Sequence, residues 1–191
     1  MTEATAARLR LFVAVSVPRP QLEALDAAVA GFREDLPGAR WAPLDNQHVT
    51  LKFLGSTPAE LFADVAQAVQ SSAESHSPSD VAVGGLGAFP SDRRARVLWA
   101  GIDDPGSLLT SLAATLDREM EPLGYGTEKR PFTPHLPLAR FKQPARVTDI
   151  LRELDPSWAS SWTVETIELY QSRLSPKGAT YEVLGSVPLN R

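Results

Sequence analysis

Residues 48–54, HVTLKFL, and residues 135–141, HLPLARF, are two phrases of the same form. Each begins with a histidine, continues with apolar residues at alternate positions and contains one cation, Lys52 in the first phrase and Arg140 in the second. Alternation with a period of two is typical of a half-buried β-strand. The repeat therefore predicts two strands that each start with a histidine. In the first of them, His48, Thr50 and Lys52 are expected to share one face.

The segments around the two phrases indicate a mixed fold. Val, Leu and aromatic residues gathered between turn residues predict strands over residues 8–17, 80–89, 94–102, 162–174 and 179–187. Apolar residues three and four positions apart predict helices over residues 21–36, 57–69, 104–124 and 145–154. The resulting order is one strand–helix–strand set written twice, once around His48 and once around His135.

The composition narrows the class of protein. The chain has 191 residues, of which 43% are hydrophobic and 22% charged, as expected for one globular domain or two small lobes that share a core. It contains no cysteine, which removes thiol nucleophiles and cysteine-based zinc sites. A net charge of −4 disfavours a protein that coats duplex DNA. No apolar run is long enough to cross a bilayer, so a cytoplasmic location is expected.

His48 and His135, the first residues of the two phrases, are the candidate catalytic residues. An unperturbed imidazole has a pKa of about 6.5, so near neutral pH one ring can accept a proton while another donates one. If the two halves of the chain pack about a pseudo-twofold axis, His48 and His135 face each other across a groove. Such a pair suits the opening of a cyclic phosphodiester. The hydroxyl of Thr50, on the face of His48, is placed to donate a hydrogen bond to a phosphate oxygen.

The phrases HVTLKFLG and FTPHLPLAR, together with RLFVAV near the N-terminus, resemble the two-histidine phosphoesterases, in particular the RNA 2′,3′-cyclic phosphodiesterases also called 2′-5′ RNA ligases. The resemblance implies an α+β fold with two pseudo-symmetric antiparallel-sheet lobes, helices on the outer faces and a central cleft. It implies one domain over residues 1–191 in which the two lobes intertwine. By position, His48 and Thr50 match the first motif, His135 the second, and Arg140 the phosphate-holding arginine that follows it.

The resemblance also implies an activity and its partners. The expected reaction is hydrolysis of a terminal 2′,3′-cyclic phosphate to a 2′-phosphate, with no metal and no cofactor. The expected partners are RNA 3′ ends or small cyclic nucleotides, with no membrane, and the expected form is a monomer.

The sequence departs from the family at Pro137, where the second motif has threonine or serine. Proline has neither a hydroxyl nor an N–H, so one phosphate donor is missing. Thr133 and Arg130, in the loop before His135, are candidates to replace it, and Arg130 is retained as a phosphate-binding candidate. Strict alternation would place Arg140 on the face opposite His135. It reaches the phosphate only if the strand bulges, ends early, or lets the long side chain wrap round it.

Two other functions fit the same residues. The first is a binding module that keeps the cleft and, with Pro137 in the motif, turns over weakly or not at all. The second is a metal-dependent hydrolase, although no third ligand at a metal-binding spacing accompanies the two histidines. His76, in the polar segment SSAESHSPS, is expected to be a solvated loop residue.

Overall fold

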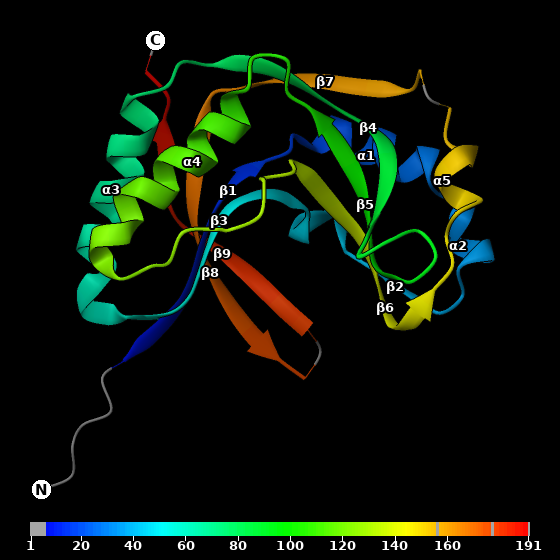
Figure 1. Cartoon of the computed structure of the whole chain (residues 1–191), viewed down its shortest axis with the longest axis horizontal. Coiled ribbons are helices and arrows are strands. Elements are labelled where there is room, and N and C mark those ends of the chain that lie inside the picture. Colours follow the sequence, from blue (N-terminus) through cyan, green and yellow to red (C-terminus); the bar gives the residue numbers. More distant parts are fainter. Residues whose placement is uncertain (1–6, 156, 177, 191) are drawn as a thin grey trace, which may run out of the picture.

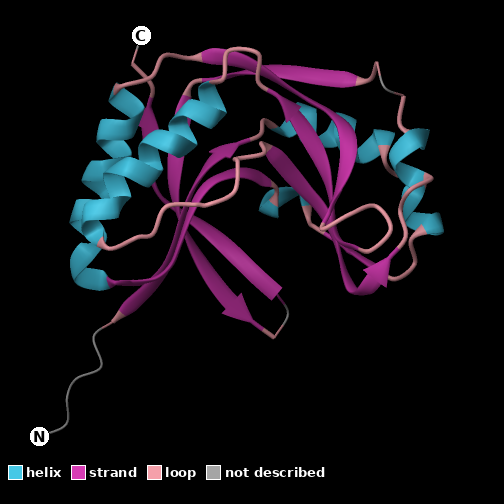
Figure 2. Cartoon of the chain, in the orientation of Figure 1, coloured by secondary structure: helices cyan, strands magenta, loops and turns pink. Residues whose placement is uncertain are grey.

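The computed structural model describes residues 7–155, 157–176 and 178–190, which form two antiparallel β-sheets with helices on their outer sides (Figures 1 and 2). The first sheet has the strand order β3-β1-β8-β9, and the second has the order β2-β6-β5-β4-β7. The strands of the first sheet are β1 (Arg8–Ser16), β3 (His48–Pro58), β8 (Thr166–Ser175) and β9 (Gly178–Pro188). Those of the second sheet are β2 (Ala39–Trp41), β4 (Ser79–Phe89), β5 (Ala95–Asp103), β6 (His135–Ala145) and β7 (Ala159–Val164).

The helices divide between the two sheets. Helices α3 (Phe62–Glu74) and α4 (Leu108–Met120) pack on each other and on the first sheet, where α3 contacts β8 and β9 and α4 contacts β3. On the other side of the molecule, α1 (Arg19–Ala28) contacts β7 and α5 (Ile150–Glu153) contacts β4. The remaining helical segments are α2 (Phe32–Asp35) and the 3₁₀ turns η1 (Leu44–Asn46), η2 (Ala59–Leu61) and η3 (Glu121–Leu123).

The chain passes repeatedly between the two sheets. It leaves the first sheet after β1, enters the second at β2, returns for β3, and crosses again to build β4 to β7 before ending with β8 and β9. One apolar core joins the two sheets, since Leu11 of β1, Leu136 of β6 and Leu112 of α4 belong to the same buried cluster. The α+β fold with two antiparallel sheets expected from the sequence is confirmed.

Three helices differ from the sequence prediction. The helix predicted over residues 57–69 begins only at Phe62, as α3, and continues to Glu74, because β3 extends to Pro58. The helix predicted over residues 21–36 is two helices, because the chain turns at Val29 and α2 starts after Gly31. The helix predicted over residues 145–154 is only the single turn α5, because β6 continues to Ala145 and the backbone N–H of Val147 donates to the backbone oxygen of Asp92, so that residues 146–149 lead into α5 outside the helix. Contacts with the chain between β4 and β5 override helix propensity there, which is a weak preference.

The strand predicted over residues 162–174 is also two strands. The chain leaves the second sheet after β7 and enters the first at β8, with Glu165 between them. Strand β2 was not predicted, because three residues are too short to show a period. It pairs with β6 and brings Arg40 opposite Arg140.

Candidate active site

A β-bulge in β3 decides which side chains accompany His48. In the pairing with β1, Thr50 lies opposite Ala14 and Lys52 opposite Val13, so Leu51 has no partner. One extra residue shifts the alternation of the strand by one. Phe53 therefore joins His48 and Thr50 on the cleft side. The expectation that Lys52 shares that face is wrong, because its side chain is only 8% exposed and lies on the other side.

Strand β6 carries the same irregularity at the equivalent place. Pro137 lies opposite Trp99 and Ala139 opposite Leu98, which leaves Leu138 without a partner. The burial pattern of the first seven residues is identical in β3 and β6. The bulge turns Arg140 to the side of Pro137, and both residues line the cleft. The bulge that the sequence required for Arg140 to reach the cleft is present.

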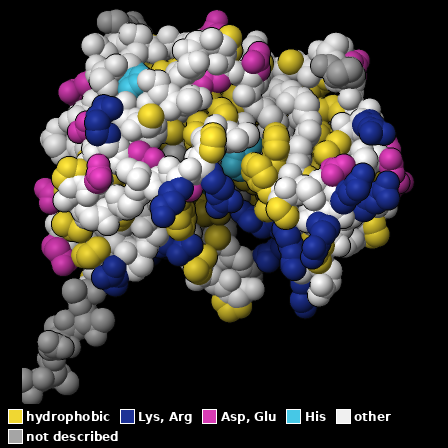
Figure 3. Space-filling model, viewed as in Figure 1, with side chains coloured by type: hydrophobic (Ala, Val, Ile, Leu, Met, Phe, Trp, Pro, Cys, Tyr) yellow, Lys and Arg dark blue, Asp and Glu magenta, His cyan; other side chains and the backbone are white. Residues whose placement is uncertain are grey.

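A cleft of about 560 Å³ has walls from both sheets. Its charged lining residues among those described are all arginines: Arg10 of β1, Arg40 of β2 and Arg140 of β6. Figure 3 shows Lys and Arg side chains gathered on both sides of a hollow near the centre of one face, with histidine surface beside it. A concave site lined by positive charges alone concentrates anions, even in a protein whose net charge is −4. The cleft is therefore suited to a phosphate-bearing ligand.

His48 lies in an aromatic corner of this cleft. The centroid of its ring is 4.7 Å from that of Phe12, 5.0 Å from that of Tyr181 and 5.6 Å from that of Tyr170. Burial among these rings lowers the pKa of His48 to about 4, and a hydrogen bond to the backbone of Asn46 opposes that effect in part. The imidazole of the free protein is therefore neutral at physiological pH and able to accept a proton.

The low pKa of His48 gives a measurable pH dependence. The unfolded chain takes up this proton near pH 6.5 and the folded chain only near pH 4, so the free energy of unfolding falls as the pH is lowered through that window. The loss from this group is about 3 kcal/mol. NMR titration of the ring measures its pKa, and urea unfolding of wild type and His48→Gln isolates its contribution. A ring that titrates near 6.5 would contradict this assignment.

His135 begins β6, which contacts β3 across the junction of the sheets. Its Nδ1 lies 2.7 Å from the backbone oxygen of Thr133, and a carbonyl only accepts, so Nδ1 carries a hydrogen and Nε2 is left for other chemistry. The ring meets those of Phe89 and Trp99 edge-on, at centroid distances of 5.1 and 5.9 Å. His135 is not among the side chains that line the cleft, whereas Pro137, two residues further, is.

The candidate phosphate-binding residues fall into two groups. Thr50 and Arg140 line the cleft, and neither side chain has a hydrogen-bond or ion-pair partner in the described part of the chain. Arg130 does not line it. Its side chain is 90% exposed, and its Nε lies 3.9 Å from a carboxylate oxygen of Glu128. The structure therefore brings Thr50 and Arg140 together with His48 and leaves Arg130 in the loop outside.

A buried ion pair holds the loop that leads into His135. The ammonium of Lys52 pairs with the carboxylate of Asp117 on α4 and donates a hydrogen bond of 2.6 Å to the backbone oxygen of Gly126. Asp117 also accepts the backbone N–H of Glu128 at 3.0 Å. Lys52, expected from the sequence on the face of His48, instead ties β3 to the segment between η3 and β6.

Two of the cleft arginines had no signal in the sequence. Arg40 lies on the unpredicted strand β2, and Arg10 lies outside both histidine phrases. Gly178 of the β8–β9 hairpin lies against the guanidinium of Arg40 and has a φ of +131°. A Cβ there would lie 2.7 Å from Nη2 of Arg40, so only glycine fits without displacing the guanidinium.

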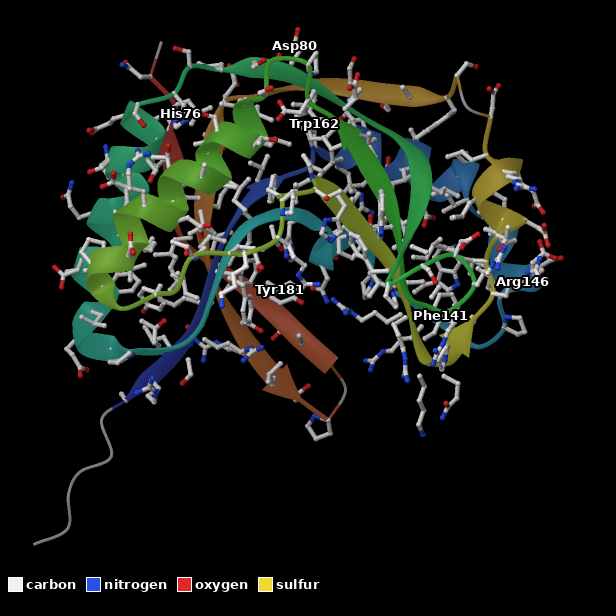
Figure 4. All side chains as sticks on the ribbon, in the orientation of Figure 1. His76, Asp80, Phe141, Arg146, Trp162 and Tyr181 are labelled. Atoms are coloured by element: carbon white, nitrogen blue, oxygen red, sulfur yellow. The ribbon has the colours of Figure 1, made fainter. Side chains whose placement is uncertain are left out.

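His76 lies away from this site. In Figure 4 it is next to helices α3 and α4, at a distance from Tyr181, which lines the cleft. Its Nδ1 hydrogen-bonds the backbone oxygen of Ser72 at 2.8 Å and its Nε2 the hydroxyl of Ser111 at 2.9 Å. His76 lies in the loop after α3, as expected, but its ring is half-buried rather than fully solvated, because it links α3 to α4. No group of three His, Asp or Glu side chains placed to hold a metal occurs among residues 7–155, 157–176 and 178–190.

Two sheets that each present a bulged, histidine-led strand beside an arginine-lined cleft are the arrangement of the two-histidine phosphoesterases. The chain belongs to the 2′-5′ RNA ligase superfamily, whose family model matches residues 16–175.

Relatives and solved structures agree with this membership. A Thermus thermophilus protein named RNA 2′,3′-cyclic phosphodiesterase is 36% identical, with 92% of this chain and 88% of the relative covered. The crystal structure of TT0787 from Thermus thermophilus superposes with a TM-score of 0.81 at 32% identity, covering 95% of this chain and 98% of that one. E. coli LigT complexed with 3′-AMP gives a TM-score of 0.79 at 25% identity, covering 97% and 100%.

A relative from Geobacillus stearothermophilus, also named RNA 2′,3′-cyclic phosphodiesterase, is 28% identical over 95% of this chain. The chain spans only 58% of that relative's length. None of the helices within the described ranges is long and apolar enough to span a membrane.

Proposed function

We propose that this chain is a phosphodiesterase that hydrolyses 2′,3′-cyclic phosphates at the ends of RNA or on small nucleotides and leaves a 2′-phosphate. The observation that carries the proposal is the repeated bulged strand, which begins with a histidine in each sheet beside one arginine-lined cleft. The relatives named RNA 2′,3′-cyclic phosphodiesterase support the same reaction. None of these observations favours a module that only binds.

In the proposed reaction, a water attacks phosphorus while the bond from phosphorus to the ribose O3′ breaks. The water gives up a proton as the new P–O bond forms, and O3′ gains one as it leaves. We assign the first transfer to His48, because its low pKa keeps the ring neutral in the free protein. The incoming phosphate anion favours the protonated ring, so substrate binding raises that pKa toward neutrality. We assign the second transfer to His135, which donates a proton to O3′.

The phosphate itself is assigned to Thr50 and Arg140. A hydroxyl donor and a guanidinium bind non-bridging oxygens most strongly when negative charge increases in the transition state. Pro137 takes the place that corresponds to Thr50 on the other strand and offers no donor. Arg140 therefore carries more of the phosphate binding here than it would beside a second hydroxyl. Arg130 has no part in this assignment, because it lies outside the cleft lining.

The test is turnover of a dinucleotide that ends in a 2′,3′-cyclic phosphate by the purified full-length protein. The expected product is the 2′-phosphate alone, identified by ³¹P NMR, at a rate that excess chelator does not change. Tight binding of a 2′-phosphorylated nucleotide without turnover would instead establish the binding-module alternative. Loss of activity in chelator would establish a metal-dependent hydrolase.

The domain organisation, oligomeric state, location and partners of the chain are also proposed. We infer that residues 1–191 act as one domain, since both sheets draw strands from distant parts of the chain and share one core. A monomer is the proposed form. A chain without cysteine needs no oxidising compartment, which supports a cytoplasmic location. RNA 3′ ends and small cyclic nucleotides are the proposed partners.

A further inference from the structure

A row of π-systems leads away from His48 along the cleft. The ring of Phe12 lies 4.7 Å from His48 and 6.5 Å from Phe53, and the guanidinium carbon of Arg10 lies 4.7 Å from the centroid of the Phe53 ring. Phe12 is 2% exposed and belongs to the interior, whereas Phe53 is 52% exposed. The far end of the row therefore presents an aromatic ring and a guanidinium to a ligand.

Two exposed apolar side chains lie in the same cleft. Four large hydrophobic side chains of the described residues are exposed, and two of them, Phe53 and Leu174, line the cleft. Leu174, near the tip of the β8–β9 hairpin, is 70% exposed. Exposed apolar side chains that gather in a concave, cation-rimmed site indicate a binding surface rather than chance exposure.

The cleft holds more positive charge than one phosphate needs. Arg140 on β6 is assigned to the reacting phosphate, while Arg10 is on β1, in the other sheet. Apart from its position over Phe53, Arg10 has no ion pair or hydrogen bond in the described ranges. Proteins commonly bind single-stranded nucleic acid with an aromatic ring, on which a base stacks, and a nearby cation, which contacts the backbone phosphate. Arg10 and Phe53 offer both groups.

We propose that Phe53 and Arg10 form a subsite for the nucleotide on the 5′ side of the cyclic end. The base stacks on the Phe53–Arg10 surface, with Leu174 at its edge, and the guanidinium of Arg10 contacts the internucleotide phosphate. The preferred substrate is then an RNA end of two or more nucleotides rather than a mononucleotide. This inference rests on the proposed function, because it requires the cyclic phosphate to be seated by Thr50 and Arg140.

The test compares kcat/KM for adenosine 2′,3′-cyclic phosphate with that for the adenylyl dinucleotide that ends in the same group. Wild type is expected to prefer the dinucleotide at least tenfold. Phe53→Ala and Arg10→Gln are each expected to reduce that ratio about tenfold, the effect of losing one stacked base or one phosphate contact. Both side chains are on the surface, so the variants are expected to fold as wild type does.

Matched controls separate this subsite from general damage to the protein. Val183→Ala removes another exposed apolar side chain that does not line the cleft, and Arg152→Gln removes an exposed arginine on α5. Both controls should keep the wild-type ratio. Equal kcat/KM for the two substrates in wild type, or an unchanged ratio in Phe53→Ala and Arg10→Gln, overturns the subsite while leaving the activity intact. If wild type hydrolyses neither substrate, the proposed function fails and the subsite with it.

Discussion

His48→Ala and His135→Ala are each expected to lower kcat by at least a hundredfold on a 2′,3′-cyclic substrate. Each replacement removes one of the two proton transfers, and a positioned acid or base contributes roughly 10²–10⁴-fold. The loss should appear mainly in kcat, because Thr50 and Arg140 still hold the phosphate. Steady-state kinetics on the purified variants measures it. If the two rings act on the same phosphorus, the double variant should lose less than the product of the single losses.

His76→Ala is the matched control for these variants. His76 hydrogen-bonds Ser72 and Ser111 and lies outside the cleft, so its removal should lower stability slightly and leave kcat within about twofold of wild type. Wild-type turnover in either His48→Ala or His135→Ala would refute the catalytic assignment of that residue.

Arg140→Gln is expected to lower kcat/KM by about a hundredfold or more. Glutamine keeps a hydrogen-bond donor but loses the charge and the two parallel N–H groups with which a guanidinium holds phosphate. Removal of one donor to a charge that develops in the transition state typically costs 10²–10³-fold. The effect should be large because Pro137 supplies no hydroxyl on the same strand. Arg140→Lys should recover only part of the loss.

Arg146→Gln is the control for Arg140→Gln. Arg146 is exposed, follows β6 in sequence, and lies near the outer edge of the molecule in Figure 4, away from the cleft. The Arg146→Gln substitution should leave kcat/KM unchanged. A lower kcat/KM in this variant would reveal an effect of the overall charge of the protein. If Arg140→Gln turned over like Arg146→Gln, Arg140 would have no role in holding the phosphate.

The repeated histidine phrase made most of this site predictable. Two like phrases in one chain indicated two equivalent strands, and the structure has them at β3 and β6 with the same burial pattern. Strict alternation failed in both, and for one physical reason. Leu51 and Leu138 are bulge residues, so the positions after them change face. The bulge in β3 places Lys52 in the interior, and the bulge in β6 turns Arg140 toward the cleft.

What the sequence could not supply depends on contacts between distant segments. Arg10 and Phe53 meet only because β1 pairs with β3, and Arg40 reaches the cleft only because β2 adds to the edge of the second sheet. Neither pairing has a local signal in the chain. The depressed pKa of His48 likewise arises from burial beside Phe12, Tyr170 and Tyr181, which come from three separate strands.

The most direct test is a crystal structure of the full chain with a bound 2′-nucleotide, the product of the proposed reaction. The predicted result is one phosphate within hydrogen-bond distance of both imidazoles, with the Arg140 guanidinium on its oxygens. A phosphate that contacts a single imidazole while the other ring points elsewhere would contradict a shared role for the two histidines.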